Sequence, residues 1–409
     1  MRITRPLTAV LVGTGLFLAA CGSGGASQSN GTPTGGAPAV SAAARTTSSP
    51  AADLRTKLDV LLGEHIFLAT KATGAALGSR TAEFQAYGAL LATNGADLGA
   101  MIGAAYGSDA QNTFNKIWSA HDGFFVDYTT AVAKGDAAAK AAAVANLTDN
   151  YIKPFSAFLA SATGLPEGTI SQLITTHVQQ TAAIVDAQAA KDWKTAYAGI
   201  RQAYAHMFMI GDALAPAIAQ KTGKFTGTLS GKAIDLRVGL DNLLQEHLYL
   251  ATDATGAALG GRNDEFAAAA NALNTNGTDL GSAIGGLFGS DAQNRFNQIW
   301  SAHNGFFVDY TKAVASKDNA AKTTAVNNLT QQYTPQFAQF LAAPTGISLS
   351  TLTQVITMHV TTTAAVVDAQ AGPTYPDAGD KDRMAAMHMS AIGDALAAGI
   401  VATNPRLFS

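Results

Sequence analysis

The chain has 409 residues, of which 47% are hydrophobic and 13% are charged, and its formal net charge is −3. A nearly neutral chain without a block of basic residues argues against nucleic acid as a partner. The apolar content is sufficient for a large core, and the length allows two domains of ordinary size.

The N-terminal segment has the pattern of a bacterial secretion signal. Arg2 and Arg5 precede an apolar run over residues 7–18, which is shorter than the roughly 20 residues that a membrane-spanning helix needs. The run ends in the sequence LAACG at residues 18–22. This motif resembles the lipobox of bacterial lipoproteins, in which the cysteine is acylated and becomes the new N-terminus.

The lipobox resemblance implies that residues 1–21 are a signal peptide and that the acylated Cys21 anchors the protein to a membrane. The expected location is the outer face of the cytoplasmic membrane, or the periplasmic side, with the folded part at the cell surface. An ordinary signal peptide or a short membrane anchor is the alternative. Cys21 is the chain's only cysteine, so no disulfide can form within the chain.

A segment of Gly, Ser, Thr, Ala and Pro follows Cys21. Residues 22–52 contain almost no large apolar side chain, and such a segment cannot bury enough surface to offset its ordering entropy. We expect it to be a flexible linker between the membrane and the folded part.

The rest of the chain is an internal duplication. The motif IWSAH at residues 117–121 recurs at residues 299–303, and the offset of 182 (303 − 121 = 182) holds without a gap for the other matching segments. A period this long indicates duplicated domains, because solenoid repeats are roughly 20–50 residues long. We predict one domain at 53–222, a linker at 223–234 and a second domain at 235–405.

Each repeat has the sequence pattern of helices throughout. Alanine is abundant, alternating β-branched residues are absent, and apolar residues recur at helical spacing. For the first repeat we predict six helices, over 53–77, 82–106, 109–133, 136–162, 167–190 and 193–219. Pro154, and Pro335 in the second repeat, should kink or split the fourth helix. Short connections between long helices favour antiparallel neighbours, so the predicted fold class is all-α, with two tandem copies of an antiparallel helical bundle.

All eight histidines of the chain belong to the duplicated pattern. Each lies on the apolar stripe of a predicted helix, and the helical spacing places it on the core-facing side. Four unpaired imidazoles in one core would be costly unless something satisfied them. A transition metal ion does so, because neutral imidazole binds Zn, Cu and Fe. We therefore predict one site per repeat, formed by His65, His121, His177 and His206 and by His247, His303, His359 and His388.

Several carboxylates also recur in both repeats. Glu64 and Glu246 precede the first histidine of each set, and aspartates could orient imidazole N–H groups around the metal. The alternative for each one is a surface charge or an ion pair with Arg80 or Arg262. The candidate aspartates are Asp127, Asp309, Asp186, Asp368, Asp212 and Asp394.

Several motifs of known chemistry are missing. Di-iron bundles carry Glu-x-x-His pairs, whereas this chain has Glu-His dipeptides, so the resemblance to ferritin-like or hemerythrin-like proteins is one of architecture only. No zinc-protease, phosphate-loop or serine-hydrolase motif is present.

Three functions remain open. The first is a lipoprotein that stores, buffers or delivers a transition metal such as Cu, Zn or Fe, and two equal sites without a substrate motif favour binding over catalysis. The second is a metal-dependent oxidase or oxygen-handling enzyme. The third is a non-catalytic envelope module with packed core histidines.

Overall fold

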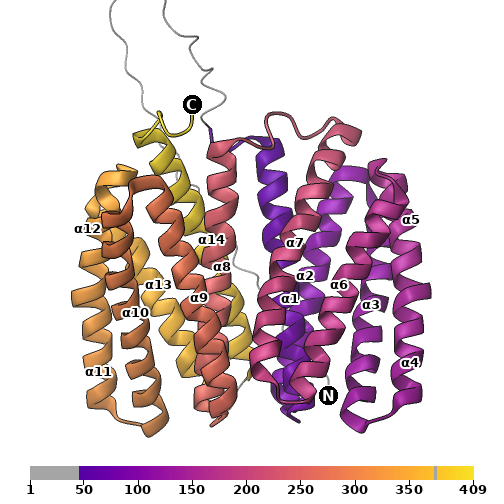
Figure 1. Ribbon diagram of the computed structural model, residues 1–409, viewed down its shortest axis with the longest axis horizontal. Helices are drawn as coiled ribbons and strands as arrows, with labels where there is room; N and C mark the ends of the chain where they lie inside the picture. Colours follow the sequence, from indigo (N-terminus) through magenta and orange to yellow (C-terminus); the bar gives the residue numbers. More distant parts are fainter. Residues whose placement is uncertain (1–45, 373–374) are drawn as a thin grey trace, which may run out of the picture. The chain divides into compact units, whose positions relative to one another are not determined.

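The computed structural model describes residues 46–372 and 375–409, which are helical almost throughout and contain no strand (Figure 1). The predicted signal segment 1–21 with Cys21, and the predicted linker up to residue 45, lie outside the described residues. The first repeat consists of α1 (Pro50–Leu77), α2 (Thr81–Tyr106), α3 (Ser108–Lys134), α4 (Ala137–Asn146), the π-helical segment η2 (Leu147–Ile152), α5 (Lys153–Thr163), α6 (Glu167–Ala189) and α7 (Trp193–Thr222).

The second repeat has the same order of elements. They are α8 (Lys232–Leu259), α9 (Asn263–Phe288), α10 (Ser290–Ser316), α11 (Asn319–Asn327), the π-helical η3 (Asn328–Tyr333), α12 (Thr334–Thr345), α13 (Leu349–Gln370) and α14 (Tyr375–Thr403). Among the described residues, α14 is the one helix long and apolar enough to cross a membrane by length and composition alone. It packs against α8 and α13, as expected of a core helix.

Five of the six helices predicted for the first repeat match the structure to within three residues at each end. The first of them starts before the predicted end of the linker at residue 52, because Pro50 occupies the first turn and the Ser49 side chain accepts a hydrogen bond from the Ala52 amide. The predicted helix 136–162 is instead divided into α4, η2 and α5.

The division occurs next to Pro154, as the sequence predicts. Proline has no amide hydrogen, so the preceding turn cannot close in the α-helical way. The turn widens, and the Lys153 amide bonds to the Thr148 carbonyl five residues earlier. The widened turn contains Tyr151, which is 1% exposed, and its equivalent in η3 is Tyr333.

Glycines in the C-terminal half of α2 allow this half of the helix to approach α3 closely. A Cβ atom at Gly95 would lie 2.8 Å from the Trp118 ring, and Gly99 and Gly103 face Asn115 and Gln111 at still closer range. The second repeat has the same arrangement at Gly277, Gly281 and Gly285. The tryptophan is thereby held against α2 at a defined depth in each repeat.

The described residues belong to one compact unit, in which the two repeats share an interior. Helix α1 packs on α8, α2 on α14, and α7 on α9. Arg201 pairs with Glu246 at 2.9 Å, and the equivalent Arg383 pairs with Glu64 at 3.0 Å, so the contact is reciprocal like a twofold interface. The predicted domain boundary at 223–234 stays a prediction.

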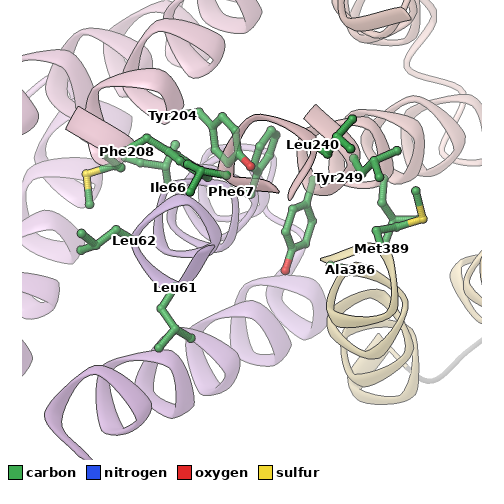
Figure 2. Packing of buried hydrophobic residues seen from close by; sticks show 14 of the residues in the cluster. Leu61, Leu62, Ile66, Phe67, Tyr204, Phe208, Leu240, Tyr249, Ala386 and Met389 are labelled. Carbon is green, nitrogen blue, oxygen red and sulfur yellow. The ribbon is translucent and has the colours of Figure 1, made fainter. Parts of the chain in front are cut away.

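Where the repeats meet, equivalent positions have diverged. Lys71 and Asp253 occupy the same position in the two repeats and form a buried ion pair at 2.6 Å. Phe67 stacks on its equivalent, Tyr249, with ring centroids 4.9 Å apart, next to Tyr204 (Figure 2). Two identical repeats would place two lysines or two aspartates face to face. The differences between the repeats therefore favour contact of the first repeat with the second over contact between two copies of the same repeat.

Replacing Arg383 with Met should destabilise the whole chain. Glu64 is 2% exposed, and loss of its cationic partner leaves a buried charge that Asn94 and Tyr249 solvate only in part. We expect the free energy of unfolding in urea to fall by about 3 kcal/mol. In the control Lys153→Met, which breaks the exposed pair with Asp149, it should change by less than about 0.5 kcal/mol. Equal effects of the two substitutions would contradict the structural role of the Arg383 pair.

Candidate metal centre

Three of the predicted histidines of the first repeat meet at its centre. His65 comes from α1, His121 from α3 and His177 from α6, and each is at most 2% exposed. One ring nitrogen from each lies within 4.8 Å of the others. The ring centroids are 5.3 to 6.0 Å apart.

The second repeat brings together the equivalent three residues. His247, His303 and His359 come from α8, α10 and α13 and are also buried. Their ligand atoms meet the same 4.8 Å limit, and their ring centroids are 5.4 to 6.1 Å apart. We refer to the two sets as the first and the second triad.

Ring nitrogens of both triads lack hydrogen-bond partners among the described residues. Both nitrogens of His177 are buried and unpartnered, as are Nδ1 of His65, His247 and His303 and Nε2 of His359. A buried polar atom without a partner is costly. Several such atoms on imidazoles that lie this close together suit a ligand site.

His121 is oriented by its own helix and by the widened turn of η2. Its Nδ1 lies 2.8 Å from the Trp118 carbonyl oxygen, which can only accept, so Nδ1 donates and Nε2 keeps its lone pair. Tyr151 stacks on the ring at 4.3 Å between centroids, as Tyr333 does on His303 at 4.4 Å. The aromatic stack therefore fixes the plane of one imidazole in each triad.

Burial keeps the triad imidazoles in their neutral, metal-binding form. Desolvation lowers the pKa of His121 to about 4 and that of His177 to about 3, and it lowers the pKa of His65 well below its ordinary value. The second triad behaves in the same way, with the pKa of His247 and that of His359 at about 3.

The dimensions of the triads suit one metal ion each after a small contraction. Zinc–nitrogen bonds of about 2.0–2.1 Å place tetrahedral ligand atoms roughly 3.3 Å apart, and the ring nitrogens lie within 4.8 Å of one another. Side-chain rotations can close a gap of this size. Three protein ligands leave a fourth position open, as in catalytic zinc sites.

The fourth histidine of each predicted set is not part of a triad. Nε2 of His206 donates to the Leu173 carbonyl oxygen at 2.9 Å, and Nε2 of His388 lies 3.4 Å from the Val355 carbonyl oxygen. The apolar stripe places these residues toward the core, but their rings turn to the backbone of the neighbouring helix. The predicted site of four histidines in each repeat is therefore corrected to a triad.

The predicted carboxylates serve other contacts. Glu64 and Glu246 pair with arginines of the opposite repeat, Asp186 and Asp368 with Lys140 and Lys322, and Asp212 and Asp394 with Arg55 and Arg237, while Asp127 and Asp309 are exposed. The alternative partners Arg80 and Arg262 bind Glu83 and Glu265 instead. None of the eight carboxylates makes a described contact with a triad.

Three residues around the first triad were not among the predicted site residues. Asp122 Oδ1 lies 3.4 Å from Nδ1 of His121, Tyr151 stacks on the same ring, and the Trp118 ring lies 4.8 Å from that of His65. The tyrosine and the tryptophan recur in the second repeat, which was a usable signal, whereas Asn304 stands in place of Asp122.

A cavity adjoins each triad. The first has a volume of about 470 Å³ and is bounded by His65, His121 and Trp118 among others. The second has a volume of about 710 Å³ and is bounded by the whole second triad.

Comparisons of the chain with protein-family models, with characterised proteins and with solved structures found no match. The function must therefore be inferred from the geometry of the triads and their cavities.

The metal-free protein should become less stable in acid, and His177→Leu should reduce this effect. A histidine whose folded pKa is lowered leaves stability intact above the unfolded value of about 6.5 and loses it as the pH falls toward the folded value. With a folded pKa of about 3, His177 accounts for a loss of about 2 kcal/mol by pH 5.

The measurement is urea unfolding of the metal-free parent and of His177→Leu at pH 7.5 and pH 5. Leucine also removes two unpartnered nitrogens, so we expect the variant to equal or exceed the parent at pH 7.5. Burial raises the pKa of Asp59 and that of Asp241, which act in the opposite sense, but both are present in both proteins and cancel. The same pH dependence in both proteins would rule out this account.

Proposed function

We propose that the protein binds one transition metal ion at each triad and stores, buffers or delivers that metal. The observation that carries the proposal is the convergence, in both repeats, of three buried imidazoles with unpartnered nitrogens. A structure that only packed its histidines would be expected to satisfy these nitrogens with protein donors and acceptors.

The donor set favours Cu, Zn or Fe over hard cations. Calcium and magnesium take oxygen ligands, and no carboxylate belongs to either triad. Imidazole suits zinc, copper and iron, and selection among them depends on geometry and supply. The hydrogen bond of His121 to the Trp118 carbonyl is the kind of outer contact that orients a ligand and raises its basicity.

The cellular setting of the proposal comes from the sequence. The lipobox resemblance and the linker of residues 22–52 support a lipoprotein held by Cys21 at the outer face of the cytoplasmic membrane or on the periplasmic side. We further propose that each repeat is one helical bundle of a tandem pair, supported by the repeated order of elements. Two equivalent triads in one chain suit a role in holding metal.

The cavities favour a second candidate, a metal-dependent oxidase or oxygen-handling enzyme. Catalytic metal sites keep a position open for substrate, and here the cavities adjoin the triads and supply space for a substrate. Storage alone does not require such a space.

Metal content is the direct test of the proposal. Protein purified without a histidine tag and dialysed against equimolar Cu, Zn and Fe should contain two metal ions per chain by elemental analysis. The double variant His121→Gln, His303→Gln removes one ligand from each triad and should lower metal affinity by about 100-fold, because losing a residue that binds the metal costs at least as much as losing one that only orients a ligand.

The matched control is His206→Gln, His388→Gln, which removes the same residue type from each repeat outside the triads. It should retain two metal ions per chain. Loss of metal in the control to the same extent would restore the four-histidine site, and full metal content in the triad variant would exclude metal binding at the triads.

Oxygen consumption separates the two candidate functions. If the protein only holds metal, the copper- or iron-loaded form should consume oxygen in the presence of ascorbate no faster than the triad variant His121→Gln, His303→Gln with the same total metal. Faster consumption by the parent, accompanied by an absorption change on adding oxygen, would favour the enzyme.

A further inference from the structure

Histidines of each triad form the floor of a cavity between helices. The first cavity is lined by α1, α2 and α3, and Thr181 of α6 also contributes to it. The second lies between the equivalent parts of α8, α9 and α10 and also contacts α13. Volumes of about 470 and 710 Å³ fall within the roughly 300–1,000 Å³ of typical small-molecule sites.

The walls of the first cavity are mainly apolar, with several threonines, Asn115 and Ser119 among them. Alanines from α1 and α2 face Phe84, Leu91, Phe125 and Val126, and Asp122 is the one charged side chain among the lining residues. In the second cavity Asn274 and Thr278 replace Ala92 and Ala96, so that wall also offers hydrogen bonds, and Lys312 is its one charged lining residue.

The cavity follows from the small residues that the sequence places on α2 and α3. The glycine contacts at Gly95, Gly99 and Gly103 hold the C-terminal half of α2 close to α3. Beyond them, a Cβ atom at Gly88 or at Gly123 would meet no atom within 4 Å, although both residues line the cavity. Glycine is unfavourable inside a helix, so open space at these two positions has no benefit for the stability of the fold.

The floor of each cavity carries the imidazoles. His65 and His121 line the first cavity, and all three histidines of the second triad line the second. Nδ1 of His65, like Nδ1 of His247, is buried and has no partner among the described residues. Apolar walls with a few convergent polar groups are the usual composition of a small-molecule site.

We propose that each cavity binds an uncharged small organic molecule with an apolar body and one nitrogen or oxygen donor. The body lies between α2 and α3, or between α9 and α10, and the donor points to the triad. This inference rests on the proposed metal site for one part: in the loaded protein, the donor atom takes the metal's open fourth position. Binding of the apolar body does not depend on the metal.

The first arm of the test measures the cavity alone. The metal-free protein is titrated with N-phenyl-1-naphthylamine, an uncharged aromatic amine that fluoresces in apolar surroundings, and should bind it saturably at two sites per chain. In Gly88→Phe, Ala270→Phe, a phenyl ring occupies each cavity at equivalent positions, and binding should weaken by about ten-fold or more. The variant should stay folded, because glycine replacement favours the helix and a Cβ at Gly88 meets no neighbour.

Two variants serve as controls for the first arm. Gly88→Ala makes the same backbone change without filling the space, and Ala267→Phe adds the same ring to an exposed position of α9. Both should bind the naphthylamine as the parent does. Absence of saturable binding to the parent, or unchanged binding to the filled double variant, would overturn the proposal.

The second arm adds the metal. Protein loaded with Co²⁺ should change its visible absorption when 4-phenylimidazole is added, and Gly88→Phe, Ala270→Phe should bind Co²⁺ normally but lose this change. A spectrum that does not respond in the parent would overturn the coordination of the donor atom. Naphthylamine binding without any Co²⁺ uptake would instead overturn the proposed function, while the cavity site would stand.

Discussion

The interaction on which the rest of the structure depends is the burial of three imidazoles in each repeat, several of whose nitrogens have no hydrogen-bond partner in the part of the chain that the structure describes. Burial makes the neutral form the stable one. The neighbouring elements fix the direction of the rings: the widened turn of η2 supplies Tyr151 against His121, and Gly95 lets Trp118 lie against α2 beside His65. Leaving buried nitrogens without partners lowers the stability of the fold, and such a loss of stability is typical of a functional site.

The contact between the repeats supports the same site from outside. Glu64 directly precedes His65 on α1, and it is held by Arg383 from α14 of the opposite repeat. The reciprocal pair, Arg201 with Glu246, holds α8 next to His247. Each triad therefore depends on its own three helices and on one arginine of the other repeat, which gives a physical reason for keeping both repeats in one chain. Two nearly independent bundles on a linker would lack this support.

Much of the fold could be predicted from the sequence, since helical spacing, capping residues and glycines act locally. The break near Pro154 followed from the missing amide, but its form as a π-helical turn carrying Tyr151 did not, because stacking on His121 is a long-range contact. The recurring carboxylates were placed beside the metal site for a related reason, and the alternative of ion pairs and surface charges describes their contacts better. Recurrence in both repeats shows that a residue matters to both, but a reciprocal interface preserves charges as well as a metal site does. The matching recurrence of Arg201 and Arg383 was the signal for the interface.

The direction in which the fourth histidine points could not be predicted from the sequence. Helical periodicity places His206 toward the core, but it does not distinguish a ring that points to the triad from one that bonds to a neighbouring helix. His206 donates to the Leu173 carbonyl, one turn before His177, and so connects α7 to the helix that carries the third histidine of the first triad. If its ring instead completed the set, a metal at the triad would have four protein ligands, the closed arrangement of structural sites. Because His206 bonds to the backbone instead, a metal held as proposed would keep its fourth position open, and the cavities adjoin the triads at which this position would lie.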